Sequence, residues 1–232
     1  MDAQRILFRF RKEGQARFLS HHDLMRLVER ALRRAALPVR MSEGYHPHPR
    51  LSIVLALPLG VAADDEALEV QFQPPVAPAH ALTELQAQAP AGIAFTAADA
   101  LPAGVRARVE SVVYEATLPP EGPIEPAHIE QFLARDSMVI ERSTPKATRS
   151  LDIRPAVDWV QLDGSTVRFQ VRIGPGSTPR PLEVLQALMA THAAHSTAIP
   201  LRRTHLNLAP FPSNDEESPR TPATEKATPN AT

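Results

Sequence analysis

The chain has 232 residues, of which 43% are hydrophobic and 22% are charged, with no cysteine and a formal net charge of −1. This length suits one large or two small globular domains. The lack of cysteine excludes disulfides, thiolate zinc sites, iron–sulfur clusters and cysteine nucleophiles within this chain. Its apolar runs are too short for a membrane span and residues 1–11 are too charged for a secretory signal, so we expect a cytoplasmic protein that makes no membrane contact.

The charges are segregated along the sequence. Residues 1–60 carry 11 Lys and Arg against 5 Asp and Glu, whereas residues 61–100 carry 6 acidic residues and no basic ones. A basic N-terminal surface attracts phosphates even on a neutral protein. The alternative is that these charges only solvate exposed faces or pair with the acidic segment.

The first part of the chain predicts the order βαββαβ. Alternation of apolar and polar residues and the placement of proline and glycine indicate strands over 5–11, 51–57, 67–72 and 93–96 and helices over 20–35 and 79–89. This order is typical of a ferredoxin-like unit.

The second part repeats this pattern less clearly. It predicts strands over 109–118, 138–141, 166–173 and 201–208, an extra strand near 159–162, and helices over 125–134 and 182–192. We therefore predict an α+β fold of two ferredoxin-like (βαββαβ) units, each an antiparallel sheet with helices on one face. The expected domains are residues 1–103 and 104–212, followed by a disordered tail over 213–232, which has little to bury.

The helix expected over 20–35 has a polar start and a basic face. Ser20 and Asp23 form a variant of the capping box, in which both side chains satisfy free backbone N–H groups. Apolar residues recur at three-to-four spacing, and arginines occupy the opposite side. These arginines, together with the N–H groups of the first turn, favour an anion such as phosphate; they are Arg26, Arg30, Arg33 and Arg34.

A stiff loop follows this helix. Each proline of His46-Pro47-His48-Pro49 pushes the preceding histidine toward an extended conformation, while Gly44 lets the chain turn. This rigidity suits either a binding loop or an ordinary surface connection. Arg40 and Arg50 add positive charge, and Tyr45 offers a ring on which a base can stack.

Two further hypotheses concern individual side chains. If His21, His46 and His48 converge, with Asp23 or Glu43 beside them, they offer ligands for a divalent metal, although no recognised metal motif is present and our prediction is that there is no metal or other cofactor. In the second part, Asp152 and Arg154 share one face of an extended strand, where a structural ion pair competes with a binding role. No catalytic motif is evident, which favours a protein that is not an enzyme.

Several short motifs together resemble a bacterial radical-SAM-associated family of unknown function. They are residues 18–26, 29–35 and 42–49, the Leu59-Gly60 turn followed by Glu66, residues 152–155, and Arg203-Thr204. The resemblance covers most of residues 4–208. It departs at His22, where an apolar residue, usually Leu, is expected, and at Tyr45, where Phe is common.

The resemblance implies partnership with a radical SAM enzyme. Members occur alone or as the C-terminal part of a longer protein that carries the radical SAM domain, and this chain corresponds to the stand-alone form. Lacking cysteine, it holds no radical SAM cluster itself. We expect an accessory module that binds substrate, RNA first, where the helix start and the His/Pro loop meet. The alternatives are a small-molecule or metal-binding enzyme built on His21, His46 and His48, and a protein-interaction adaptor.

The residues expected to bind substrate come mostly from the first part of the chain. They are Ser20, His21, Asp23, Arg26, Arg30, Arg33, Arg34, Glu43, Tyr45, His46, His48, Arg50, Asp152 and Arg154.

Overall fold

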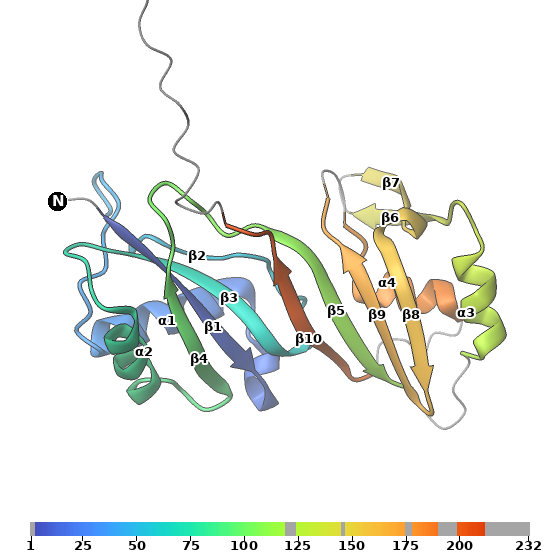
Figure 1. The fold of residues 1–232 in the computed structure, drawn as a ribbon, viewed down its shortest axis with the longest axis horizontal. Helices are drawn as coiled ribbons and strands as arrows, with labels where there is room; N and C mark the ends of the chain where they lie inside the picture. Colours follow the sequence, from blue (N-terminus) through green and yellow to red (C-terminus); the bar gives the residue numbers. More distant parts are fainter. Residues whose placement is uncertain (1–2, 119–123, 145–146, 175–177, 190–198, 212–232) are drawn as a thin grey trace, which may run out of the picture.

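The computed structural model describes residues 3–118, 124–144, 147–174, 178–189 and 199–211. Within these ranges the protein is a mixed α+β structure with a mostly antiparallel sheet and four α-helices, which confirms the expected α+β class (Figure 1). The tail expected over 213–232 lies outside the described residues, as does the end of the helix expected over 182–192. The division at residue 103 stays a prediction.

The first half is organised around its first strand. Its elements are β1 Gln4–Lys12, the 3-10 helix η1 Gly14–Phe18, α1 His21–Arg34, β2 Leu51–Ile53, β3 Ala62–Phe72, α2 Pro78–Ala87 and β4 Ile93–Ala100. The strands lie in the order β4-β1-β3, and β2 pairs with the other edge of β3. Phe8 and Phe10 of β1 alternate with charged residues and pack with Leu32 of α1 and Leu85 of α2, because a strand turns successive side chains to opposite faces.

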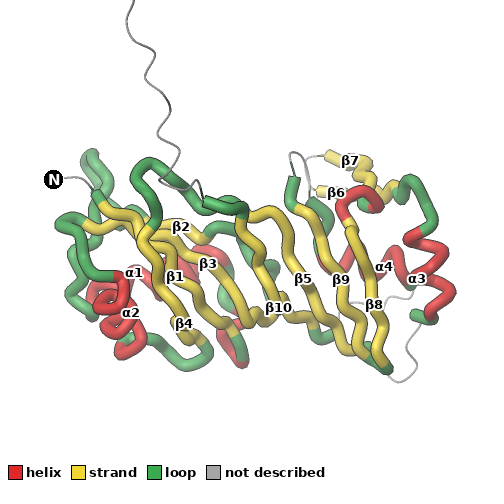
Figure 2. Tube along the Cα trace, in the orientation of Figure 1, coloured by secondary structure: helices red, strands yellow, loops and turns green. Residues whose placement is uncertain are grey.

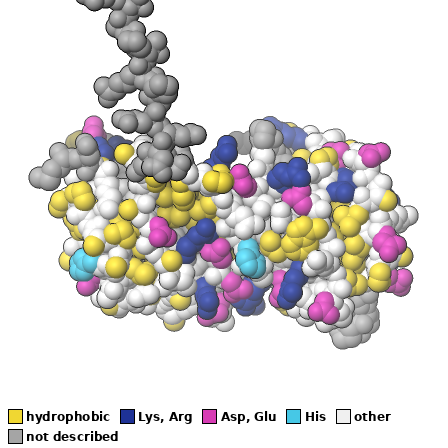
Figure 3. All heavy atoms as spheres, viewed as in Figure 1, with side chains coloured by type: hydrophobic (Ala, Val, Ile, Leu, Met, Phe, Trp, Pro, Cys, Tyr) yellow, Lys and Arg dark blue, Asp and Glu magenta, His cyan; other side chains and the backbone are white. Residues whose placement is uncertain are grey.

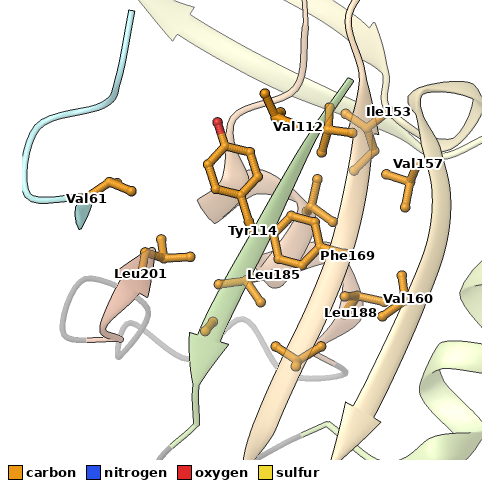
Figure 4. Packing of buried hydrophobic residues seen from close by; sticks show 14 of the residues in the cluster. Val61, Val112, Tyr114, Ile153, Val157, Val160, Phe169, Leu185, Leu188 and Leu201 are labelled. Atoms are coloured by element: carbon orange, nitrogen blue, oxygen red, sulfur yellow. The ribbon is translucent and has the colours of Figure 1, made fainter. Parts of the chain in front are cut away.

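The second half has a comparable layout. Its elements are β5 Val109–Thr117, α3 Pro126–Leu133, β6 Val139–Thr144, β7 Ala147–Asp152, the 3-10 helix η2 Arg154–Ala156, β8 Val157–Asp163, β9 Thr166–Arg172, α4 Pro181–Leu188 and β10 Leu201–Leu208. The strands lie in the order β10-β5-β9-β8, while β6 and β7 form a separate hairpin. Figure 4 shows Tyr114 of β5 and Phe169 of β9 beside Leu185 of α4, and the two ring centroids are 5.7 Å apart.

One sheet joins the two halves, where the sequence predicted two. β10 pairs in parallel with β3, through Arg202 opposite Ala62 and Arg203 opposite Ala63, so that eight strands form a continuous array (Figure 2). This pairing was missed because it joins residues about 140 positions apart, and strand patterns are read within short windows. The strand expected over 67–72 also begins earlier, at Ala62, where β3 meets β10.

A buried polar cluster lies at this junction. We call it the junction cluster, and it consists of Lys12, Glu66, Tyr114 and Arg203. Arg203 donates from Nη1 to both carboxylate oxygens of Glu66, at 2.9 and 3.1 Å, and from Nη2 to the hydroxyl of Tyr114 at 3.0 Å. Lys12 donates to the carbonyl of Leu19 at 3.1 Å. The side chains of Arg203 and Glu66 are each only 1% exposed, so solvent contributes little to their stabilisation.

The junction cluster also shows how the helices are arranged. Glu66 lies on the same face of β3 as Leu68 and Val70, which pack against α1 and α2, whereas Tyr114 packs with Leu185 of α4. Since Arg203 contacts both Glu66 and Tyr114, the helices of both halves cover the same face of the sheet. The other face carries the alternate residues of each strand, among them Arg5, Glu69 and Gln71.

Replacing Arg203 by Met is expected to destabilise the protein by about 3–5 kcal/mol, because Glu66 would be left buried without its partner. Chemical denaturation measures the loss. Arg202→Met is the matched control, since Arg202 pairs with Asp64 at a partly exposed position and such pairs contribute only about 0–1 kcal/mol. Equal effects of the two substitutions would contradict the importance given to Arg203.

The pH dependence of stability provides a second test of the junction cluster. Burial raises the pKa of Glu66 from 4.5 to about 7, against the opposing effect of Arg203 and Lys12. As the pH rises from 4.5 to 7, the unfolded chain loses this proton and the folded chain retains it, so the free energy of unfolding falls. Glutamine has no such proton to retain, so we expect the Glu66→Gln variant to lack this contribution to the decrease in the free energy of unfolding between pH 4.5 and 7. A variant with the same pH profile as the parent protein would contradict the assignment.

Candidate functional site

The start of α1 is capped by Ser20 as the sequence predicts, whereas the carboxylate of Asp23 accepts from the Ser20 hydroxyl and, within the described structure, not from a backbone N–H group. The hydroxyl of Ser20 accepts a hydrogen bond from the backbone N–H of Asp23 at 3.2 Å and donates to its carboxylate at 2.7 Å. His21 and His22 follow, both exposed, with ring centroids 5.7 Å apart. Ser20 and Asp23 therefore satisfy each other, and their arrangement is explained by helix capping alone.

The arginine face of α1 is only partly free. Arg26, Arg30 and Arg33 are exposed on the helix surface. Arg34 instead donates to the side-chain oxygen of Gln88 at 3.1 Å and to its backbone carbonyl at 2.7 Å. Arg34 thus fastens α1 to the end of α2, and its guanidinium is largely committed to this structural contact.

The His/Pro loop, residues 42–50, lies between α1 and β2 and is closed by hydrogen bonds. Ser42 and His48 close it through three contacts: the backbone N–H of Ser42 donates to the carbonyl of His48 at 2.8 Å, the backbone N–H of His48 donates to Oγ of Ser42 at 3.0 Å, and Oγ lies 2.8 Å from Nδ1 of His48. Arg40 and Glu43 approach to 3.7 Å. At the tip, the rings of Tyr45 and His46 are 4.8 Å apart and exposed.

The loop and the helix start do not meet, contrary to the sequence-based expectation. The loop leaves the sheet beside Phe72, which pairs with Gln4 at the start of β1, whereas Leu19 contacts Lys12 at the end of β1. At about 3.3 Å per residue, these two ends of β1 are about 25 Å apart. Figure 1 shows the light-blue loop and the 3-10 helix η1 at opposite ends of this strand. Helix α1 runs back along the sheet, so its end, and not its start, is near the loop.

This separation also removes the proposed three-histidine metal site. His21 stands at the far end of β1 from His46 and His48, and no group of three His, Asp or Glu side chains in the described ranges is placed to hold a metal ion. The condition for this hypothesis, that the three histidines converge, is not met, because spacing in the sequence does not show where α1 begins relative to the loop.

A pocket beside the loop is lined by four parts of the chain, three of which contribute basic residues. We call it the basic pocket. It has a volume of about 220 Å³ and is lined by Arg5 of β1, Glu69 and Gln71 of β3, Arg106 of the connection between β4 and β5, and residues 48–52, which include His48 and Arg50. Because Arg5, Glu69 and Gln71 alternate with the core residues of their strands, the pocket opens on the face of the sheet opposite α1 and α2.

The basic pocket has an excess of positive charge and a donor without a partner. Three arginines line it against one carboxylate, that of Glu69. Arg5 donates to the carbonyl of Val105 at 2.6 Å and lies 3.5 Å from Glu69, which also accepts from the backbone N–H of Ala107 at 2.5 Å. Among the described residues, Nε of Arg50 is buried and finds no acceptor. Nε of Arg203 in the junction cluster is likewise buried without an acceptor in the described structure, so the excess of positive charge is what distinguishes the basic pocket.

Asp152 and Arg154 have structural roles at the end of β7. The Asp152 carboxylate accepts from the backbone N–H groups of Met138 at 2.8 Å and Arg154 at 3.1 Å, and the first of these bonds holds the pKa of Asp152 below its usual range. Arg154 donates to the carbonyls of Leu133 at 2.8 Å and Val157 at 2.6 Å. Asp152 ends β7 as expected for a strand, but Arg154 begins η2, so the two residues do not share one face of an extended strand.

Sequence reasoning missed two arginines of the pocket. Arg5 belongs to an alternating strand and Arg106 to the connection after β4, and both are far in sequence from Arg50. A signal for Arg5 was the apolar–basic alternation of residues 5–11, which was read only as a solvated face. We find no comparable signal for Arg106.

The family of the chain follows from its sequence. Residues 5–190 match the model described as "Uncharacterized protein conserved in bacteria (DUF2344)". The chain belongs to this family. The residues that the DUF2344 match covers include α1, the His/Pro loop and the whole basic pocket.

Other comparisons add little to the family assignment. No curated protein matches the chain. Among solved structures, the chain is similar to one titled "Crystal Structure of an Unknown Protein from Galdieria sulphuraria", with 14% identity and a TM-score of 0.28 over 90% of this chain and 99% of that one. A score this low carries no argument about either fold or function.

The described residues contain no helix that is long and apolar enough to cross a membrane.

Proposed function

We propose that the protein is an accessory module that binds a phosphate-bearing substrate, RNA first, in the basic pocket. The observation that carries this proposal is the convergence of Arg5, Arg50 and Arg106 on one small cavity, where three guanidinium groups face a single carboxylate. In addition, Nε of Arg50 has no acceptor among the described residues. A phosphate oxygen supplies the missing acceptor and the compensating negative charge.

Arginine suits this task for chemical reasons. Its planar guanidinium presents fixed N–H donors that match phosphate geometry, and hydrogen bonds between charged groups are about twice as strong as neutral ones. In the basic pocket, Arg5 is already held by Val105 and Glu69, which leaves it oriented before a ligand arrives. A preorganised site loses less side-chain entropy on binding.

The charge distribution favours a defined phosphate contact over a broad polyanion surface. The whole chain has a net charge of −1, and on the face seen in Figure 3 basic and acidic side chains are intermingled with apolar ones. The exposed arginines of α1 lie on the helix-covered side of the sheet, away from the basic pocket. We therefore propose that the pocket, and not Arg26, Arg30 and Arg33, makes the principal contact.

We also propose that each half is a ferredoxin-like unit. The strands lie in the sheet orders β4-β1-β3-β2 and β10-β5-β9-β8. Along the chain, one helix follows the first strand of each half (β1 or β5) and a second helix follows the third (β3 or β9), which supports this assignment. Such units occur in many proteins that bind RNA, but this is an analogy of fold and carries less than the site does.

A radical SAM enzyme is the proposed partner. The support for it is the set of motifs that resemble the radical-SAM-associated family, and two of their residues, Glu66 and Arg203, form the buried pair of the junction cluster. In this proposal the chain presents substrate and the partner performs the chemistry. The alternative is an adaptor that binds the radical SAM enzyme without RNA. Purification with and without ribonuclease distinguishes the two.

Replacing Arg50 and Arg106 by Met is expected to weaken RNA binding and to reduce its salt dependence, because each lost phosphate contact lowers the slope of log K against log salt by about 0.7 for a single strand. Fluorescence anisotropy with a labelled RNA measures both quantities, and competition by inorganic phosphate or a mononucleotide shows whether a free phosphate suffices. Arg26→Met and Arg30→Met on α1 are the controls. Unchanged binding in the pocket variants, or a larger loss in the controls, would contradict the proposal.

Affinity purification of the full chain from bacterial cells, with and without ribonuclease, tests the partnership. The expected result is recovery of a radical SAM protein together with RNA. Recovery of that protein with no RNA before ribonuclease treatment would favour the adaptor, and recovery of neither would refute both.

A further inference from the structure

Tyr45 is the most exposed large hydrophobic side chain in the described structure. Its side chain is 93% exposed, compared with 67% for Leu59 and 53% for Phe18. An aromatic ring in this position contributes nothing to the core, and burying an aromatic side chain would gain substantial free energy. The ring is therefore available to a ligand at little conformational cost.

The loop that carries Tyr45 is held in place at its base. Met41 and Pro49 form an isolated bridge, the contacts between Ser42 and His48 close the loop above it, and the backbone N–H of Arg50 donates to the carbonyl of Arg40 at 2.8 Å. Gly44, with a φ of +119°, provides the turn just before the tip. The tip is thus presented on a braced support, and the ring of His46 lies against that of Tyr45.

The same loop leads directly into the basic pocket. His48 and Arg50 line this pocket, and Tyr45 precedes His48 by three residues, which span at most about 10 Å of chain. Arg50 is five residues from Tyr45, which span at most about 18 Å of chain. A phosphate held by Arg50 and a ring at the loop tip are therefore within reach of a few consecutive nucleotides of one single strand.

From this juxtaposition we propose that the protein recognises an unpaired nucleotide, whose base stacks on Tyr45 while a neighbouring phosphate occupies the basic pocket. The inference rests on the proposed function and names its substrate class as single-stranded RNA. In a duplex the bases are stacked on each other and paired, so their faces are closed to an aromatic side chain, whereas a loop, bulge or end exposes them. Stacking tolerates any base, because every base has a π-face.

The test uses the full chain and two labelled probes, a single-stranded RNA and a duplex that contains the same strand. We expect tighter binding of the single strand. Tyr45→Ala should weaken that binding by at least about fivefold, the lower end of the range for loss of one base–aromatic stack. Tyr45→Phe keeps the ring and should bind as the parent protein does. Leu59→Ala, which removes another exposed apolar side chain, is the matched control.

The outcomes separate this inference from the proposed function. If single strand and duplex bind equally, or if Tyr45→Ala binds as the parent does, stacking on Tyr45 is refuted and the phosphate pocket stands. If Tyr45→Phe loses as much as Tyr45→Ala, the hydroxyl and not the ring is responsible, which also refutes stacking. If the parent protein binds neither probe at low salt, the proposed function itself fails.

Discussion

The contact between Arg203 and Glu66 is the interaction on which the arrangement of the molecule depends. It lies where β10 meets β3, the only pairing between the two halves within the described sheet. Arg203 also donates to the carbonyl of Ala56 at 3.1 Å, which fixes the segment before β3. That segment in turn holds η1, through a hydrogen bond of 3.0 Å from the backbone N–H of Gly60 to the carbonyl of Arg17. One buried guanidinium thus connects both halves of the sheet to the entry of α1.

The motifs on which the resemblance rests, together with the neighbouring Arg50, fall into two groups in the structure. Ser20 with Asp23 caps a helix, Glu66 with Arg203 closes the sheet, and Asp152 with Arg154 braces the end of β7. These pairs are explained by stability. Tyr45 and His46 at the exposed tip of the loop, and the side chain of Arg50 in the lining of the basic pocket, have no comparable explanation within the described structure. Function is therefore sought where the fold does not account for the residue.

Local features were predictable from the sequence, and contacts between distant segments were not. The cap at Ser20, the alternation in β1 and most element positions depend on neighbouring residues, which a short window contains. The β3–β10 pairing joins positions about 140 residues apart, so no local pattern shows that the two expected sheets are one. Likewise, His21 and His46 looked like partners because both lie near prominent motifs, yet α1 carries the chain away from one end of β1 and toward the other.

The candidate site consists partly of other residues than the sequence predicts, also because its residues come from distant segments. The loop itself was identified from its prolines and histidines, and Arg50 was among the expected residues. Its partners Arg5 and Arg106 come from a strand and a connection that only the folded sheet brings together. The histidine at the helix start was expected to complete the site, and the arginine of the first strand is what stands beside the loop instead.

We propose that a phosphate binds the guanidinium of Arg50, and NMR of arginine Nε–H groups can decide whether it does. The full chain, labelled with ¹⁵N, is titrated with a single-stranded RNA while the Nε–H resonances of Arg50, Arg26 and Arg30 are followed. We expect the Arg50 resonance to shift during the titration while those of Arg26 and Arg30 change little. Shifts confined to the α1 arginines, with Arg50 unmoved, would contradict it.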